Sequence, residues 1–133
     1  MIYGIGCDLC QIERIKKSLE GPHGSTFVQR VYGPQEQQQL GLPAAAGAVS
    51  GRTAASAAAD FAAKEAFLKA ARLGIAGGIA LAQVQAVRLP GGAPEYRFTG
   101  EAAAWMEQRG LTAHLSLSHD GGIAMAYCVL ERA

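Results

Sequence analysis

The chain has 133 residues, half of which are hydrophobic, and a formal net charge of only +1. A chain of this length forms one domain with a proper core but not two. The small net charge and the scattered basic residues exclude a nucleic-acid binder that depends on bulk positive charge. No apolar run approaches the ~20 residues of a membrane span, and no basic signal-peptide segment opens the chain, so we expect a cytoplasmic protein.

Residues 1–8 have the pattern of a β-strand that ends at a carboxylate. Larger side chains alternate with Gly4, Gly6 and Asp8. The two glycines share one face of the strand, where they let another backbone or a ligand approach closely. Asp8 closes this face, and its carboxylate either meets a ligand there or caps the helix that follows.

The cysteines favour a chain without disulfides or structural zinc. They are odd in number: Cys7, Cys10 and Cys128. The C-x-x-C formed by the first two has no second pair to complete a zinc site. We therefore expect ordinary thiols in a reducing compartment. The alternative, a thiol redox protein, requires the C-x-x-C at the N-terminus of a helix.

Short helices are predicted to follow the strand. Apolar residues at helical spacing mark the first helix: Ile12, Ile15 and Leu19. Gly21 and Pro22 end it. Its basic residues predict either a solvated face or a docking surface for an acidic partner; they are Arg14, Lys16 and Lys17. Ser25 is expected to cap a second helix and Pro34 to open a third.

A long central helix is predicted after a loop-like segment, 41–52, that is rich in small residues. Residues 54–71 contain many alanines and neither proline nor glycine, and Gly74 is a fitting stop. Phe61 and Leu68 mark its buried side, and Glu65 lies between them. A half-buried carboxylate is costly to desolvate unless a positive group meets it.

Two partners for Glu65 are open at this point. Lys69, four residues further on, would form a helix-surface ion pair worth about 0.2–0.5 kcal/mol. Alternatively, Glu65 joins a second acidic group from elsewhere in the chain, for which Asp8 is the candidate. The second alternative predicts a functional site between the strand and the helix.

The C-terminal half is predicted to be strand-rich. Strands over 79–89 and 95–99 flank a turn rich in glycine and proline, and a helix follows Thr99 and ends at Gly110. Strands over 113–119 and 123–130 form a closing hairpin. His119 stands at the lip of that hairpin, either as a surface residue or as part of a site.

Several separated segments, in order, resemble the holo-[acyl-carrier-protein] synthase family, the small phosphopantetheinyl transferases. They are MIYGIGCD (1–8), FAAKEAF (61–67) with Lys69 after it, LSLSHD (115–120) and, more loosely, FVQRVYGPQE (27–36). The resemblance covers nearly the whole chain. It implies an α+β fold in which a small antiparallel sheet packs on a long central helix, and a homotrimer with its sites between neighbouring subunits.

The resemblance also implies a reaction, in which the phosphopantetheine arm of coenzyme A passes to a serine of apo-acyl carrier protein. Asp8 and Glu65 would hold Mg²⁺ against the pyrophosphate. Lys69 would either assist the deprotonation of the serine or steady the leaving phosphate. A magnesium ion takes one or two carboxylates together with waters and phosphate oxygens, which suits such a pair.

Further roles follow from the same resemblance. Lys64 would contact coenzyme A phosphates, and His119 would sit beside coenzyme A. The basic residues of the first helix would meet the acidic carrier protein.

One position departs from the family pattern. Asp60 occupies the place before Phe61 where the family usually has an arginine. If that arginine normally binds coenzyme A, either the affinity for coenzyme A is lowered here or Arg52 reaches the ligand from the preceding loop. Alternatively, Asp60 is only a helix-cap residue. The departure also motivates a second hypothesis, a non-catalytic module of the same fold that binds coenzyme A or a carrier protein.

Overall fold

A computed structural model describes residues 1–44, 47–74 and 77–133, and it has the α+β architecture that the sequence predicts. Residues 45 and 46 of the predicted loop lie outside the described residues. The elements in order are β1 (Ile2–Gln11), α1 (Ile12–Glu20), α2 (Gly24–Val31), α3 (Pro34–Leu40), α4 (Gly51–Ala70), the short 3-10 helix η3 (Leu81–Gln83), β2 (Val84–Arg88), β3 (Pro94–Phe98), α5 (Gly100–Arg109), β4 (Leu111–Asp120) and β5 (Ile123–Arg132).

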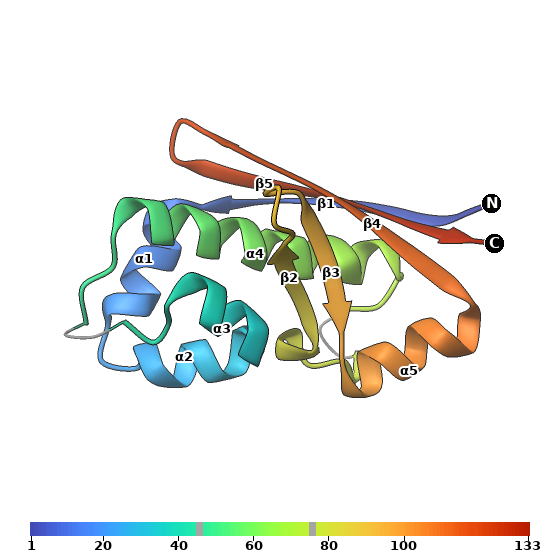
Figure 1. The fold of residues 1–133 in the computed structure, drawn as a ribbon, viewed down its shortest axis with the longest axis horizontal. Coiled ribbons are helices and arrows are strands. Elements are labelled where there is room, and N and C mark those ends of the chain that lie inside the picture. The colour runs from blue at the N-terminus through green and yellow to red at the C-terminus, as the bar shows by residue number, and fades with distance from the viewer. Residues whose placement is uncertain (45–46, 75–76) are drawn as a thin grey trace.

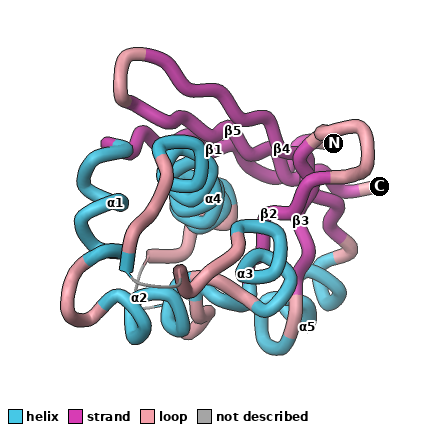
Figure 2. Tube along the Cα trace, turned by 60° about the vertical axis from the view of Figure 1, so that its left-hand side comes forward, coloured by secondary structure: helices cyan, strands magenta, loops and turns pink. Residues whose placement is uncertain are grey.

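The long helix α4 lies along one face of an antiparallel sheet with strand order β1-β5-β4 (Figure 1). The first and last strands pair, so the chain termini lie side by side, and the amide of Arg132 donates to the carbonyl of Met1. A second hairpin, β2-β3, crosses beside α4. Helices α1 to α3 lie together near the N-terminal half of α4 (Figures 1 and 2).

The close contact between β1 and α4 depends on small residues on both sides. A Cβ atom on Gly4 would collide with the carbonyl of Ala70, and one on Gly6 with the carbonyl of Ala66. Alanines line the facing side of α4 and are almost fully buried. The prediction that the glycine face lets another backbone approach closely is therefore confirmed, and the backbone that packs against it is that of the central helix.

An aromatic cluster fills the space between α4, β3 and α5. Phe67 is fully buried, and its ring centroid lies 5.0 Å from that of Phe98 and 5.9 Å from that of Trp105. Tyr96 joins the cluster and donates its hydroxyl hydrogen to the carbonyl of Ala63. These contacts fix the rotation of α4 and hence the directions in which its charged residues point.

Several predicted boundaries and caps were wrong. The first strand continues to Gln11, so Asp8 does not cap α1. The cap of α2 is His23, which places Ser25 inside the helix. The central helix is capped instead by Ser50, whose hydroxyl accepts from the Thr53 amide.

The central helix ends at Ala70, before the predicted stop. Arg72 then adopts a left-handed conformation, with φ of 62°, which turns the chain without a glycine. The predicted strand over 79–89 is shorter, because a 3-10 turn occupies Leu81–Gln83. Among the described residues, no helix is both long and apolar enough to cross a membrane.

Candidate functional site

Asp8, Glu65 and Lys69 come together where β1 crosses α4. Asp8 lies on the helix-facing side of β1, two residues beyond Gly6. The ammonium of Lys69 donates to Asp8 Oδ1 at 3.2 Å and to the carbonyl of Cys7 at 3.0 Å. Of the two alternatives left open for Glu65, the ion pair with Lys69 is not the one found among the described residues, because Lys69 pairs with Asp8.

Glu65 projects one helical turn before Lys69 and is half-buried. Burial raises the pKa of its carboxyl, and the negative charge of Asp8 raises it further, whereas Lys69 and Arg14 oppose the shift. A cation bound beside Glu65 and Asp8 would relieve the cost of the negative charge on the half-buried Glu65 carboxylate. The arrangement therefore suits a positively charged ligand.

The donor set fits magnesium better than a metal held by protein alone. No cluster of three or more His, Cys, Asp or Glu side chains that could hold a metal occurs within residues 1–44, 47–74 and 77–133. Magnesium commonly binds through one or two carboxylates and completes its shell with waters and substrate phosphate oxygens. Asp8 and Glu65 supply that number of protein ligands.

Helix α1 brings basic residues next to this carboxylate pair. Its apolar side, Ile15 and Leu19, is buried, and this leaves Arg14 and Lys17 exposed. The Arg14 guanidinium lies 5.9 Å from the centroid of the Phe61 ring on α4. Lys16 is half-buried rather than exposed as predicted. The edge of the site nearest α1 is therefore positively charged.

His119 lies elsewhere on the chain, at a cavity of about 250 Å³ between α4, the β2-β3 hairpin and β4. Neither Asp8 nor Glu65 lines that cavity. The lining residues are Ala55, Ser56, Ala59, Arg88, Gly92, Pro94, Leu117, Ser118 and His119. Within one chain, the predicted metal ligands and the predicted coenzyme A residue are thus in two different places.

Arg52 is exposed in the first turn of α4. It precedes Ala55, Ser56 and Ala59 by three, four and seven residues, so it belongs to the helical face that lines the cavity. Arg52 is thus in the helix rather than in the predicted loop, and it is not among the residues that line the cavity.

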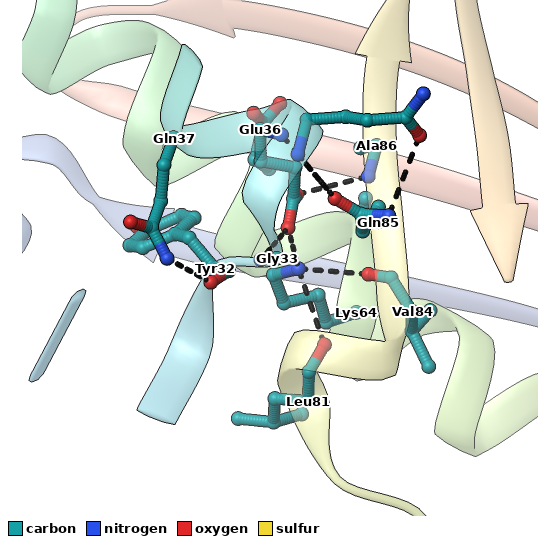
Figure 3. A network of polar contacts seen from close by, with 12 residues as sticks. Tyr32, Gly33, Glu36, Gln37, Lys64, Leu81, Val84, Gln85 and Ala86 are labelled. Atoms are coloured by element: carbon teal, nitrogen blue, oxygen red, sulfur yellow. Dashed lines mark hydrogen bonds and ion pairs between the residues drawn. The ribbon is translucent and has the colours of Figure 1, made fainter. Parts of the chain in front are cut away.

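The predicted contact of Lys64 with coenzyme A phosphates is wrong, because this side chain is fully buried. Its ammonium is bonded to Glu36 and to the carbonyls of Leu81 and Val84, which uses all three N–H groups (Figure 3). Burial lowers the pKa of Lys64 and raises that of Glu36, and the attraction within the pair opposes both shifts. Lys64 therefore ties α4 to α3 and β2 and offers no donor to a ligand.

Asp60 is neither exposed nor a helix cap. It lies within α4, only 2% exposed, with its Oδ1 atom 2.8 Å from Nη2 of Arg88 on β2. Burial raises the pKa of Asp60 to about 7, and the Arg88 guanidinium opposes this shift. Sequence reasoning missed Arg88, because nothing in the sequence pairs it with a residue 28 positions earlier.

The thiol redox hypothesis is wrong for this fold. Cys7 and Cys10 lie on opposite faces of β1, with Cys7 exposed and Cys10 buried, and neither begins a helix. Burial also raises the pKa of the Cys10 thiol, which disfavours the reactive thiolate. Both remain free cysteines, as expected.

The chain is similar to known proteins over nearly its whole length. Residues 4–128 match the 4'-phosphopantetheinyl transferase superfamily. A holo-[acyl-carrier-protein] synthase of Myxococcus xanthus is 42% identical over 130 residues, which cover 98% of this chain and 95% of that protein.

Solved structures show the same fold. The crystal structure of holo-[acyl-carrier-protein] synthase from Neisseria meningitidis superimposes with a TM-score of 0.83 at 31% identity, covering 99% of this chain and 100% of that one. A synthase from Bacillus anthracis in complex with CoA (3',5'-ADP) superimposes with a TM-score of 0.78 at 28% identity, covering 100% and 99% of the two chains.

Proposed function

The chain belongs to the 4'-phosphopantetheinyl transferase superfamily, and we propose that it acts on coenzyme A and apo-acyl carrier protein through the site between β1 and α4. It is a holo-[acyl-carrier-protein] synthase: it moves the 4'-phosphopantetheine arm of coenzyme A to a serine hydroxyl of the carrier protein. The serine oxygen bonds to the pantetheine-bearing phosphorus and its proton is released to solvent, while the pyrophosphate bridge breaks and adenosine 3',5'-bisphosphate leaves.

The observation that carries the residue assignment is the meeting of Asp8, Glu65 and Lys69 in a family member. Asp8 and Glu65 would hold Mg²⁺, and the ion would supply positive charge to neutralise the charge that develops on the departing phosphate. Both carboxylates stand on regular elements, Asp8 on β1 and Glu65 on α4, so their positions are fixed before a ligand binds.

Lys69 assists from the rim of this pair. Its side chain is 58% exposed, yet its ammonium is held at Asp8 and the Cys7 carbonyl. The third N–H group is available for a phosphate oxygen of the leaving group. We assign Lys69 to steadying that phosphate, since an ammonium already bonded to two acceptors is a donor rather than a base.

The carrier protein binds at α1, beside the carboxylates. Acyl carrier proteins are acidic partners in the family that this chain resembles, and Arg14, Lys16 and Lys17 present positive charge at this edge. Coenzyme A extends into the cavity that His119 lines, where Arg52 approaches from the first turn of α4.

The complete site is formed by two subunits of a homotrimer. The carboxylates and the His119 cavity are in different places on one chain, so a second copy must bring them together. The outer face of the sheet offers an interface: Ile5 and Leu9 are 55% and 67% exposed, and Met125 and Tyr127 are 38% and 41% exposed. Exposed apolar surface of this kind usually marks an interface, and a closed ring repeats one contact.

Intact-mass measurement tests the transfer. The protein is incubated with coenzyme A, Mg²⁺ and several apo-acyl carrier proteins, and the carrier should gain the mass of one phosphopantetheine arm. A serine-to-alanine carrier is the matched control and should gain nothing. Binding of coenzyme A or carrier without any mass gain would replace this function by that of a non-catalytic binding module.

A further inference from the structure

Arg88 is held in place by groups on two sides. Its guanidinium lies against the buried carboxylate of Asp60, with Nη2 at 2.8 Å from Oδ1. Its backbone is clamped by the side chain of Gln39, which accepts from the Arg88 amide at 2.8 Å and donates to the Arg88 carbonyl at 2.9 Å. Opposite Arg88 in the hairpin stands Pro94, which has no N–H group, so the clamp replaces a ladder bond.

The guanidinium keeps donors for a ligand. The Arg88 side chain is 29% exposed while that of Asp60 is 3% exposed, so the carboxylate lies on the interior side and the guanidinium on the solvent side of the pair. A guanidinium has five N–H donors, and the contact with Asp60 engages one nitrogen. Because Arg88 lines the His119 cavity, its remaining N–H donors are available to a ligand there.

The cavity itself favours an anion. Polar side chains that line it can all donate hydrogen bonds: Ser56, Arg88, Ser118 and His119. None of the described residues in its lining carries a carboxylate. A partly buried guanidinium beside hydroxyl and imidazole donors is a setting that favours charge-assisted hydrogen bonds to phosphate.

We propose that Arg88, oriented by Asp60, binds the ribose phosphate of coenzyme A; this inference rests on the function proposed above. The family resemblance leads one to expect an arginine at residue 60. Here the positive charge is supplied instead by Arg88 on the neighbouring strand β2. Asp60 is thus a positioning residue, and Arg88 is a binding residue.

The ribose phosphate is chosen over the pyrophosphate on two grounds. Asp60 precedes Glu65 by five residues, which on an α-helix turns the side chains about 140° apart, so Arg88 lies on a different side of α4 from the carboxylate pair. The pyrophosphate must reach that pair and its metal ion. The ribose phosphate does not react and meets no metal, so its charge must be matched by a protein cation.

Equilibrium binding of two nucleotides tests the inference without catalysis. Adenosine 3',5'-bisphosphate carries the ribose phosphate, and adenosine 5'-monophosphate lacks it. In Arg88→Ala, affinity for the bisphosphate should fall about ten- to a hundredfold, which is the scale of one lost charge-assisted contact. Affinity for the monophosphate should change by less than about twofold. The wild-type preference between the two nucleotides should therefore largely disappear.

The matched control is Arg97→Ala, on the paired strand β3. Arg97 is exposed, forms a surface pair with Glu95 and does not line the cavity. It should keep the wild-type preference. If Arg88→Ala lowers both affinities equally or neither, or if Arg52→Ala instead removes the preference, the inference is overturned.

Two further variants separate positioning from folding. Arg88→Gln keeps the side-chain length without the charge and serves if the alanine variant unfolds; it should show the same loss of preference. Asp60→Asn should raise the Michaelis constant for coenzyme A with a smaller effect on kcat, and Arg88→Lys should restore only part of the lost affinity. A changed kcat with an unchanged Michaelis constant in Asp60→Asn contradicts the positioning role.

The proposed function fails in a different way. If the wild type bound neither nucleotide and transferred no phosphopantetheine, both proposals would fall. If it transferred the arm but Arg88→Ala kept its preference for the bisphosphate, only the present inference would fall.

Discussion

Lys69 reaches from the last turn of α4 across to β1, where its ammonium lies 3.2 Å from Asp8 Oδ1. The two residues are 61 positions apart, and only the close packing of Gly4 and Gly6 against α4 brings them together. The same packing half-buries Glu65 beside Asp8, and this burial, followed by the charge of Asp8, raises the pKa of the Glu65 carboxyl. A structural contact between small residues thereby builds the candidate metal site.

Lys64 and Glu36 form an ion pair in which both side chains are fully buried. Lys64→Met should cost about 3–5 kcal/mol of unfolding free energy, because removing one partner leaves the other charge buried and unpaired. Lys69→Met is the matched control on the same helix and should cost little stability, since Lys69 is 58% exposed. Denaturant unfolding measures both.

The Lys64 prediction discriminates between two roles of this residue. If Lys64→Met remained as stable as the wild type but raised the Michaelis constant for coenzyme A, the lysine would be a ligand after all. A stability loss with an unchanged Michaelis constant in the folded fraction supports the interior role.

The pKa of Glu65 predicts a pH limit for metal binding. Burial and Asp8 raise this pKa, so the carboxylate form that binds Mg²⁺ is lost as pH falls through a value above that of an ordinary glutamate. The uncharged form is favoured in the folded state, so protonation of this group does not destabilise the fold. Calorimetric titration with Mg²⁺ at several pH values between about pH 8 and pH 5 should show that the affinity for Mg²⁺ falls as the pH is lowered, while the protein stays folded. A midpoint at or below that of an ordinary glutamate would refute the assignment.

Charge reversal on α1 should separate docking from chemistry. Lys17→Glu is predicted to weaken the binding of the carrier protein and to leave the affinity for coenzyme A unchanged. Exposed charges act mainly on the association rate and its salt dependence. Arg14→Glu should weaken the binding of both the carrier protein and coenzyme A, since the charge of Arg14 acts on Glu65 and opposes the rise in its pKa. Stopped-flow association at several salt concentrations is the measurement. Equal effects of the two variants on both substrates would contradict this division.

Subunit mixing tests whether two chains share the site. Asp8→Asn and His119→Ala should each be nearly inactive alone. After dissociation and reassembly, some sites in the hybrid trimers regain both wild-type groups, so activity should reappear. Absence of recovery despite proven exchange of subunits, or a fully active monomer, would rule out the shared site.

Much of this architecture could be predicted from the sequence, because its signals are local. The glycine alternation of β1, the alanine-rich α4 and the turn before β3 each specify their element over a few residues. Asp8 and Glu65 could be named from the family resemblance, and the structure brings the two together.

The errors concern groups whose roles depend on distant partners. Lys64 and Lys69 both look like surface lysines of a helix in the sequence, yet Lys64 meets Glu36, 28 residues away, in the core. The position of the Arg88 guanidinium likewise depends on its ion pair with Asp60 on another element. Helical spacing fixes which face of α4 a residue occupies, but not which neighbouring element covers that face.

The central claim is that Asp8 and Glu65 hold the metal for phosphopantetheine transfer, and the rate of holo-carrier formation by Glu65→Gln tests it most directly. The rate should fall about a hundredfold or more at saturating Mg²⁺, since losing ~3 kcal/mol of metal-assisted stabilisation has that effect. Thermal stability should be unchanged or slightly raised, and Glu107→Gln, on the exposed side of α5, should keep full activity. A Glu65→Gln rate equal to that of the wild type at saturating Mg²⁺ would contradict the account.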